Sequence, residues 1–165
     1  MRRRLIRGLL LLPLLAAAPL GAQEVAPAKV ARSIERIFGG HPRVDTVLAG
    51  QARVLRIHTG DAVAGFAQVR NVIGKDQPIT FLVAIDSTGV LKDVDVLVYR
   101  EPYGGEVAYE AWRKQFRGKG PDAPLTVGRD IRNISGATIS SHAVTQGVRQ
   151  ALADLSAWRA QGLLR

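Results

Sequence analysis

The chain has 165 residues, a length that suits one domain with a hydrophobic core and is too short for two of ordinary size. It contains no cysteine, which excludes disulfides, cysteine-ligated iron–sulfur clusters, a thiol nucleophile and a lipid anchor on an N-terminal cysteine. The formal net charge is +9, but four of the arginines lie within the first seven residues and the remainder form no basic block, so nucleic acid is not an expected partner.

Residues 1–22 are predicted to be a secretory signal peptide. Four arginines precede an apolar stretch, and small residues follow it at Gly21 and Ala22, as in a cleavage zone. An uncleaved membrane anchor is the alternative, but the apolar stretch contains Pro13 and Pro19 and is shorter than the roughly 20 residues that span a bilayer. We therefore expect an exported protein that is periplasmic or otherwise extracytoplasmic, with membrane association left open.

Residues 23–64 are expected to form a helical lead-in. Four apolar residues recur with a helical period before two glycines: Val30, Ile34, Ile37 and Phe38. Residues 46–58 fit two patterns, because Leu48, Ala52 and Leu55 have helical spacing whereas residues 53–57 alternate like a strand. We favour a helix there.

Residues 65–158 are expected to form the main domain. Alternating or β-rich runs predict strands at 65–72, 79–85 and 90–99, and the turn DSTG joins the last two in a hairpin at the centre of an antiparallel sheet. Apolar residues at helical spacing predict a helix over 107–116 and a longer one from Ser140 onwards. Helices around strands without a strict βαβ order indicate an α+β fold, a small antiparallel sheet with flanking helices.

Common enzymatic arrangements are absent from the sequence. The three histidines lie far apart without a zinc-binding spacing: His41, His58 and His142. Ser141 and His142 are neighbours on a helix, so their side chains point in different directions and cannot form a catalytic relay. Asp93 and Asp95 share one strand face, opposite the valines, and we expect them to be solvated.

The run SGATISS, at 135–141, carries the strongest chemical signal. Hydroxyl side chains before an amphipathic helix suit a helix cap, because a side-chain oxygen there accepts a hydrogen bond from a free backbone N–H. The same N–H groups and the positive end of the helix dipole also suit a phosphate, with Gly136 allowing close approach and Thr138 offering a hydroxyl. The residues alone leave both interpretations open.

Four motifs in the same order resemble one family. The run PITFLVAIDSTGVLKDVDVL holds the paired strands, REPYGGE forms a glycine-containing loop, WRKQFRGK follows it, and SGATISS precedes AVTQGV. Together they are similar to the FMN-binding domain of the flavin subunits of the sodium-translocating NADH:quinone reductase and of the Rnf electron-transport complexes. The resemblance covers about Gly65 to Leu155 and implies that family's fold.

The resemblance assigns roles to ten residues. Thr138 would accept a phosphoester bond to FMN, made by a flavin transferase, with Ser135, Gly136 and Ala137 shaping the turn. Ser140 and Ser141 would contact the phosphate or cap the helix. The residues implied to lie against the isoalloxazine ring are Glu101, Tyr103, Gly104 and Gly105.

The sequence departs from the family at one position. The family's transferase motif has an aspartate six residues before the threonine, where this chain has Arg132, and the nearest acid is Asp130. Arg132 either weakens recognition by the transferase or helps to neutralise a phosphate.

The implied function is an extracytoplasmic electron carrier, not an enzyme in its own right, that serves a membrane or periplasmic redox partner. The alternatives are a flavin-dependent extracytoplasmic reductase, or the donor domain of one, and a flavin-free secreted interaction module.

Overall fold

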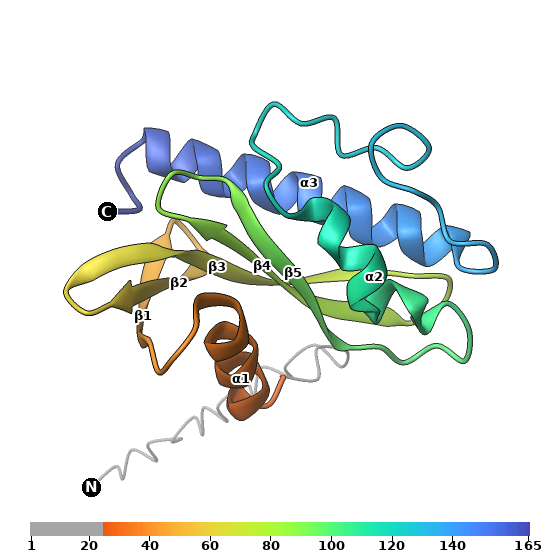
Figure 1. Ribbon diagram of the computed structural model, residues 1–165, viewed down its shortest axis with the longest axis horizontal. Helices are drawn as coiled ribbons and strands as arrows, with labels where there is room; N and C mark the ends of the chain where they lie inside the picture. Colours follow the sequence, from red (N-terminus) through yellow and green to blue (C-terminus); the bar gives the residue numbers. More distant parts are fainter. Residues whose placement is uncertain (1–24) are drawn as a thin grey trace, which may run out of the picture.

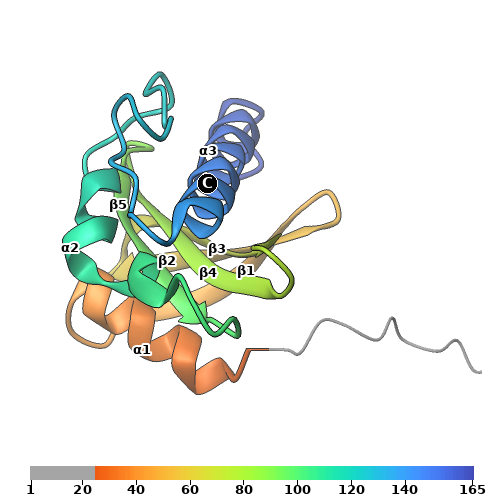
Figure 2. The same cartoon turned by 90° about the vertical axis from the view of Figure 1, so that its right-hand side faces the viewer.

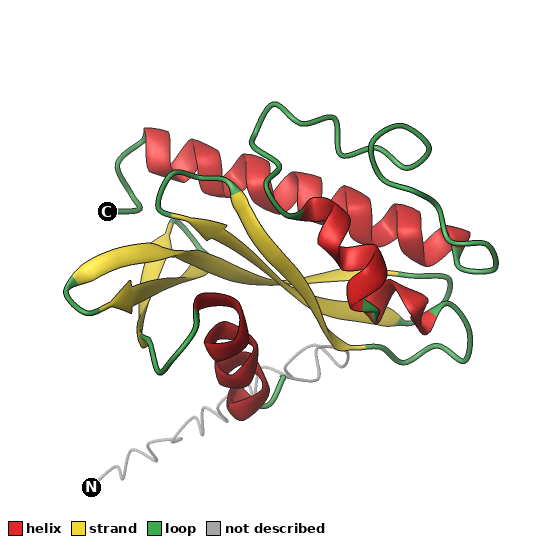
Figure 3. Cartoon of the chain, in the orientation of Figure 1, coloured by secondary structure: helices red, strands yellow, loops and turns green. Residues whose placement is uncertain are grey.

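The computed structural model describes residues 25–165. The predicted signal peptide, residues 1–22, lies outside this range. The helices are α1 (Pro27–Phe38), η1 (Gly105–Ala108), α2 (Glu110–Arg113), η2 (Lys114–Phe116) and α3 (Thr138–Ala160). The strands are β1 (Arg43–Ala49), β2 (Ala52–Thr59), β3 (Ala62–Ile73), β4 (Pro78–Asp86) and β5 (Leu91–Val98), and Figure 3 shows them in yellow between the red helices.

The strands form one antiparallel sheet in chain order, β1-β2-β3-β4-β5 (Figure 1). The strands predicted at 65–72, 79–85 and 90–99 are confirmed, and so is the α+β fold class. The predicted central position of the 79–99 hairpin is wrong. β3 is the central strand and β5 lies at one edge, because β1 and β2 extend the sheet on the other side.

The helix expected over 46–58 is also wrong, because this stretch forms most of the β1–β2 hairpin. The turn between the strands contains Gly50 with φ of 62°, a left-handed conformation that glycine adopts without strain and that ends a regular helix. Beyond the turn, Val54 and Ile57 are fully buried, on opposite faces of β2. Burial on both faces of a strand overrides the helical spacing of three apolar residues.

Helices cover both faces of the sheet. Figure 2 shows α3 on one face and α1 on the other, with α2 beside β5. α3 packs on β3 and β4 over the larger part of the core, which includes Phe81, Val148 and Leu152. α1 packs on β4 and β5 over a smaller cluster that contains Ile34 and Leu82. No helix among residues 25–165 is long and apolar enough to cross a bilayer.

Two predicted helices differ in extent. The one expected over 107–116 is three short helical turns, η1, α2 and η2, in which Trp112 and Phe116 pack edge to face with ring centroids 5.2 Å apart. Both rings are buried, so these turns close the core beside β5. The helix expected from Ser140 begins two residues earlier, at Thr138.

Asp93 and Asp95 are not solvated as expected. The side chain of Asp93 is only 4% exposed, and it forms ion pairs with Arg36 of α1 at 2.8 Å and with Arg117 at 3.0 Å. Asp95 pairs with Arg36 at 3.2 Å and with Arg113 at 3.3 Å. We call these five residues the aspartate–arginine cluster, and it joins α1 to the end of α2 and to Arg117 around the β5 edge.

Candidate functional site

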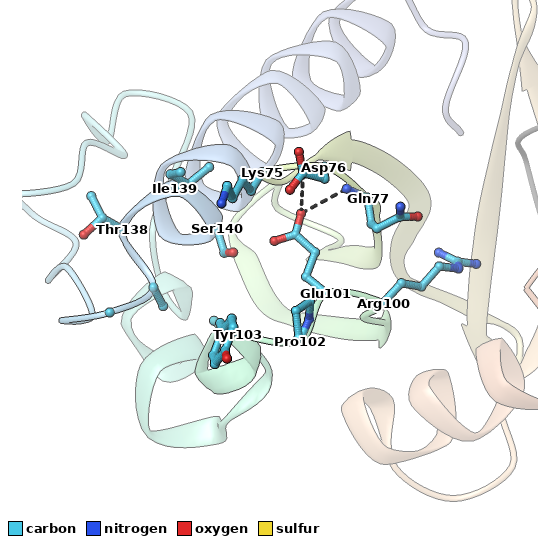
Figure 4. Close-up of a pocket in the computed structure, with 13 residues that line it drawn as sticks. Lys75, Asp76, Gln77, Arg100, Glu101, Pro102, Tyr103, Thr138, Ile139 and Ser140 are labelled. Carbon is cyan, nitrogen blue, oxygen red and sulfur yellow. Dashed lines mark hydrogen bonds between the residues drawn. The ribbon is translucent and has the colours of Figure 1, made fainter.

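A cavity of about 650 Å³ lies where three segments meet at one end of the sheet (Figure 4). The segments are the β3–β4 turn at 74–77, the loop that follows β5, and the first turn of α3. The volume is within the range of small-molecule sites. Seven of the ten residues predicted for the site line it: Glu101, Tyr103, Gly104, Gly136, Ala137, Thr138 and Ser140.

The other three predicted residues lie beside the cavity. Gly105 begins η1 against the ring of Tyr99, and Ser135 is exposed in the turn that precedes α3. Ser141 is fully buried, and its hydroxyl donates to the carbonyl of Ala137 at 2.9 Å. Ser141 therefore faces the protein interior and does not reach the cavity.

Of the two interpretations left open for SGATISS, the helix cap is not formed. The N-cap residue of α3 is Ala137, and no side chain accepts a hydrogen bond from its first turn. The first intrahelical bond is donated by Ser141 to Ala137, so the N–H groups of Thr138 and Ile139 have no partner within the helix. These groups, at the positive end of a 23-residue helix, remain available to an anion.

The Ser140 side chain binds the phenol hydroxyl of Tyr99 instead of capping the helix. The hydroxyl of Tyr99 donates to the carbonyl of Tyr103 and lies 2.9 Å from the hydroxyl oxygen of Ser140. A phenol has one proton, so Ser140 donates its own to Tyr99. This pair ties the loop after β5 to the first turn of α3, and burial, as the main cause, raises the pKa of Tyr99.

Gly104 is required on two grounds. Its φ is 87°, in the left-handed region, and a Cβ there would lie 2.6 Å from the Tyr99 hydroxyl and 2.9 Å from the Ser140 hydroxyl. The backbone of the loop can therefore approach α3 only without a side chain at this position.

Glu101 fixes the wall of the cavity that the β3–β4 turn forms. Its Oε1 accepts hydrogen bonds from the backbone N–H groups of Asp76 at 2.8 Å and Gln77 at 3.0 Å, the dashed lines of Figure 4. The bond from Gln77 is the main cause that lowers the pKa of Glu101 below its ordinary value. The carboxylate thus holds the β3–β4 turn beside the loop after β5.

Thr138 lies at the other end of the labelled residues in Figure 4. Its side chain is exposed, and its hydroxyl oxygen accepts a hydrogen bond from the amide of Asn133 at 3.0 Å. Gly136 has φ of 82°, and a Cβ there would meet no heavy atom within 4 Å. The turn before α3 is therefore open on the side that a ligand would approach.

Several lining residues were not predicted from the sequence. Lys75 and Arg100 bring positive charge, and Pro102 and the half-exposed Ile139 bring apolar surface. Ile139 belongs to SGATISS, and Arg100 and Pro102 belong to REPYGGE, so the motifs themselves could have identified these three. Lys75 carried no signal, because only the pairing of β3 with β4 places its turn beside α3.

The structure separates the roles of Arg132 and Asp130. The side chain of Arg132 is exposed, whereas its carbonyl accepts from the Trp112 indole and its N–H donates to Gln115, both at 2.8 Å. The carboxylate of Asp130 binds Lys119 at 3.0 Å and the N–H of Thr126 at 2.8 Å. Asp130 is thus occupied and does not substitute for an acid at position 132.

Among residues 25–165, no three histidine, aspartate or glutamate side chains are grouped to hold a metal ion. His58 is buried and pairs with Asp45 at 2.8 Å, far along the sequence from the cavity.

Two comparisons agree with this geometry. The sequence model of the FMN-binding domain matches residues 74–153, which include all three segments of the cavity. The chain is also 35% identical over 86 residues to a subunit of the proton-translocating ferredoxin:NAD(+) oxidoreductase complex from Clostridium ljungdahlii, an alignment that covers 47% of this chain and 46% of that protein. The chain thus spans less than half the length of this relative.

These matches confirm the resemblance seen in the four motifs. The segment that matches contains β4, β5 and most of α3, together with every predicted site residue. Residues 74–153 therefore belong to the FMN-binding domain family, and FMN is the cofactor of this domain.

Proposed function

We propose that the protein is an exported electron-transfer flavoprotein that carries FMN attached through its phosphate to Thr138. One observation carries the proposal: Thr138 presents an exposed hydroxyl at the uncapped N-terminus of α3, on the wall of the cavity. The match to a subunit of an oxidoreductase complex supports electron transfer as the role.

The residues around the cavity fit the two chemical parts of FMN. The free N–H groups of Thr138 and Ile139, with the ammonium group of Lys75 in the lining, suit a phosphate. Pro102 and Tyr103 provide apolar and aromatic surface on the opposite wall, and Tyr103 is 81% exposed, so its ring is free to cover a planar ligand.

Bound FMN would supply the redox chemistry, since a flavin takes up two electrons and can release them one at a time. The chain's own residues hold the walls of the cavity in place and so orient the flavin. Glu101 keeps the β3–β4 turn in place, and the Tyr99–Ser140 pair keeps the loop after β5 against α3. A covalent bond also suits an exported protein, because a weakly held cofactor would be lost by dilution.

We assign a carrier role and not a catalytic one. Of the two carboxylates in the lining, Glu101 already accepts two backbone hydrogen bonds, and its pKa is lowered, which disfavours a role as a proton donor near neutral pH. Asp76 is exposed at the surface of its turn. Electrons would therefore enter and leave through partner proteins that approach the flavin.

Maturation and location are parts of the same proposal. Residues 1–22 would direct export, a flavin transferase would form the ester, and a membrane or periplasmic redox partner would exchange electrons with the flavin. In the ester the Thr138 oxygen loses its proton and bonds to phosphorus, so the chain gains the mass of FMN less one water.

The test is the intact mass and visible spectrum of protein exported together with a transferase. We expect a yellow chain with the added mass, and apo mass for Thr138→Ala. Thr46→Ala, which removes an exposed hydroxyl on β1, is the matched control and should be modified like the parent chain. An unmodified, colourless parent chain would overturn the proposal.

A further inference from the structure

We propose that Asn133 is a positioning residue for flavin attachment: its amide orients the hydroxyl of Thr138 and stabilises the charge that develops on the oxygen during ester formation. This inference rests on the proposed attachment at Thr138. The observation behind it is the hydrogen bond from Asn133 Nδ2 to Thr138 Oγ1, 3.0 Å long, across the turn that precedes α3.

The turn brings the two side chains together. Ala137 N–H donates to the carbonyl of Ile134 at 3.0 Å, and Gly136 takes a left-handed φ of 82°, which reverses the chain so that residue 133 lies beside residue 138. Five residues of separation would place these side chains far apart in an extended chain. The contact is therefore a product of the turn.

The backbone of Arg132, the residue before Asn133, is held by two hydrogen bonds. The buried Trp112 donates its indole N–H to the carbonyl of Arg132, and the side chain of Gln115 accepts from the Arg132 N–H. Gln115 also donates to the carbonyl of Trp112 at 3.0 Å. α2 and η2 therefore hold the backbone from which the Asn133 side chain reaches Thr138.

The direction of the hydrogen bond decides what it does chemically. The amide donates, so it occupies one lone pair of the threonine oxygen and leaves the hydroxyl proton and the second lone pair for reaction. A donor at this oxygen also favours the partly negative charge that forms as the proton leaves. Asn133 therefore both selects a rotamer of Thr138 and favours attack by its oxygen.

The reaction that it would assist balances with a flavin dinucleotide as donor. The Thr138 oxygen loses its proton and bonds to the phosphorus nearest the flavin, while the phosphoanhydride bond breaks and the departing nucleoside monophosphate takes up a proton. The transferase supplies the active site for this exchange and this chain supplies the oxygen. No oxidation or reduction occurs in the step.

The experiment follows the initial rate of mass gain of the full secreted chain with purified transferase and the flavin dinucleotide. Asn133→Ala should lower the rate about tenfold, the effect of one lost hydrogen bond to a reacting oxygen. Asn133→Asp should lower it further, because a carboxylate cannot donate and repels the phosphate. Asn133→Gln keeps an amide donor and should recover to within about threefold of the parent chain.

Two further measurements distinguish positioning from folding. The methyl and Hα coupling constants of Thr138 in the apo protein should report one χ1 rotamer in the parent chain and averaging in Asn133→Ala. Asn71→Ala is the control, since Asn71 also pairs with a threonine, its Oδ1 accepting from the Thr80 hydroxyl at 2.6 Å, but on β3 and β4. It should react at the parent rate, and Asn133→Ala should keep the parent melting temperature within about 2 °C.

The outcomes separate this inference from the proposal on which it depends. A parent chain that gains mass at the same rate as Asn133→Ala would overturn the role of Asn133 and leave attachment at Thr138 intact. A parent chain that gains no mass would overturn the attachment itself. An Asn133→Asp chain that reacts faster than the parent would show that an acceptor is needed at this position, which contradicts the donor role.

Discussion

Two polar regions of the molecule, the aspartate–arginine cluster at the β5 edge and the first turn of α3, use charge in opposite ways. In the cluster, Asp93 is buried and ion-paired with Arg36 and Arg117. Its pKa is lowered, since these arginines outweigh the burial that acts against the charged form. At α3, the N–H groups of Thr138 and Ile139 have no partner within the helix.

The difference indicates how a binding region can be told from a structural one. Both regions contain several polar groups that come from distant parts of the sequence. In the cluster the groups satisfy one another, so burial is tolerated, and removal of any one group would leave its partners unpaired. At α3 the bracing groups, such as Glu101 and the Tyr99–Ser140 pair, hold the walls while the donors between them stay free.

The largest effect is expected from Asp93→Asn. The substitution keeps the shape but removes the charge that faces Arg36, Arg113 and Arg117, and the free energy of unfolding should fall by about 3 kcal/mol. Urea unfolding measures this, and flavin attachment at 25 °C should continue in the folded fraction. Asp61→Asn, in the exposed β2–β3 turn, is the control, and equal losses for both variants would show that the cluster contributes nothing specific.

Gly104→Ala should have the next largest effect. A side chain in the left-handed conformation costs about 1 kcal/mol, and displacement of the Tyr99–Ser140 pair adds about 1 kcal/mol more. We also expect weaker binding of free FMN, because the cavity wall moves. Gly118→Ala is matched in φ, at 78°, but its Cβ meets no atom within 4 Å, so it should show the conformational cost alone.

If the two glycine variants lose the same stability in urea and bind FMN equally well in a fluorescence titration, the close approach of the loop to α3 is not what Gly104 provides.

Arg132→Asp should speed flavin attachment by about threefold, the scale of one exposed charge. The backbone of this residue is held by Trp112 and Gln115, so the exposed side chain can change without loss of the turn. The rate of mass gain with the transferase measures the effect. Arg129→Asp makes the same charge change three residues earlier and should leave the rate unchanged. An unchanged rate for Arg132→Asp would show that the charge at position 132 does not affect recognition by the transferase.

The smallest effect is a pH dependence at Glu101. Its pKa lies below the ordinary value of 4.5 because backbone N–H groups, first that of Gln77, favour the charged form. A lowered pKa stabilises the fold above pH 4.5 and ceases to do so as the pH falls through the folded-state value. The melting temperature of the parent chain should therefore exceed that of Glu101→Gln at pH 7, and the gap should close towards pH 3. A constant gap from pH 7 to pH 3 would contradict this.

Much of the domain is predictable from local patterns. The runs that form β3, β4 and β5 alternate or are rich in β-branched residues, and Val144, Val148 and Leu152 mark α3 by their helical spacing. The motifs SGATISS and REPYGGE also locate two of the three segments of the cavity. Local patterns suffice here because each element buries its own apolar face against the same core.

The failures of prediction share one physical cause, which is dependence on distant partners. Residues 46–58 have helical spacing but become two strands, because Gly50 turns the chain and β3 offers a pairing edge. Asp93 is predicted to be solvated, and only the packing of α1 places Arg36 beside it. One of the two interpretations of the motif has its hydroxyls cap α3, but Ser140 binds the Tyr99 hydroxyl and Ser141 binds the carbonyl of Ala137 instead.

The fold class, the family and the threonine to which the proposals refer all follow from the order of residues, because they depend on apolar periodicity and on residues that are adjacent in the chain. Three properties of the site arise only when the chain folds: the N-terminus of α3 stays uncapped, Lys75 joins the lining of the cavity, and Asn133 binds Thr138. Whether a polar group is free depends on which partners folding brings within about 3 Å of it, and linear order does not encode that distance.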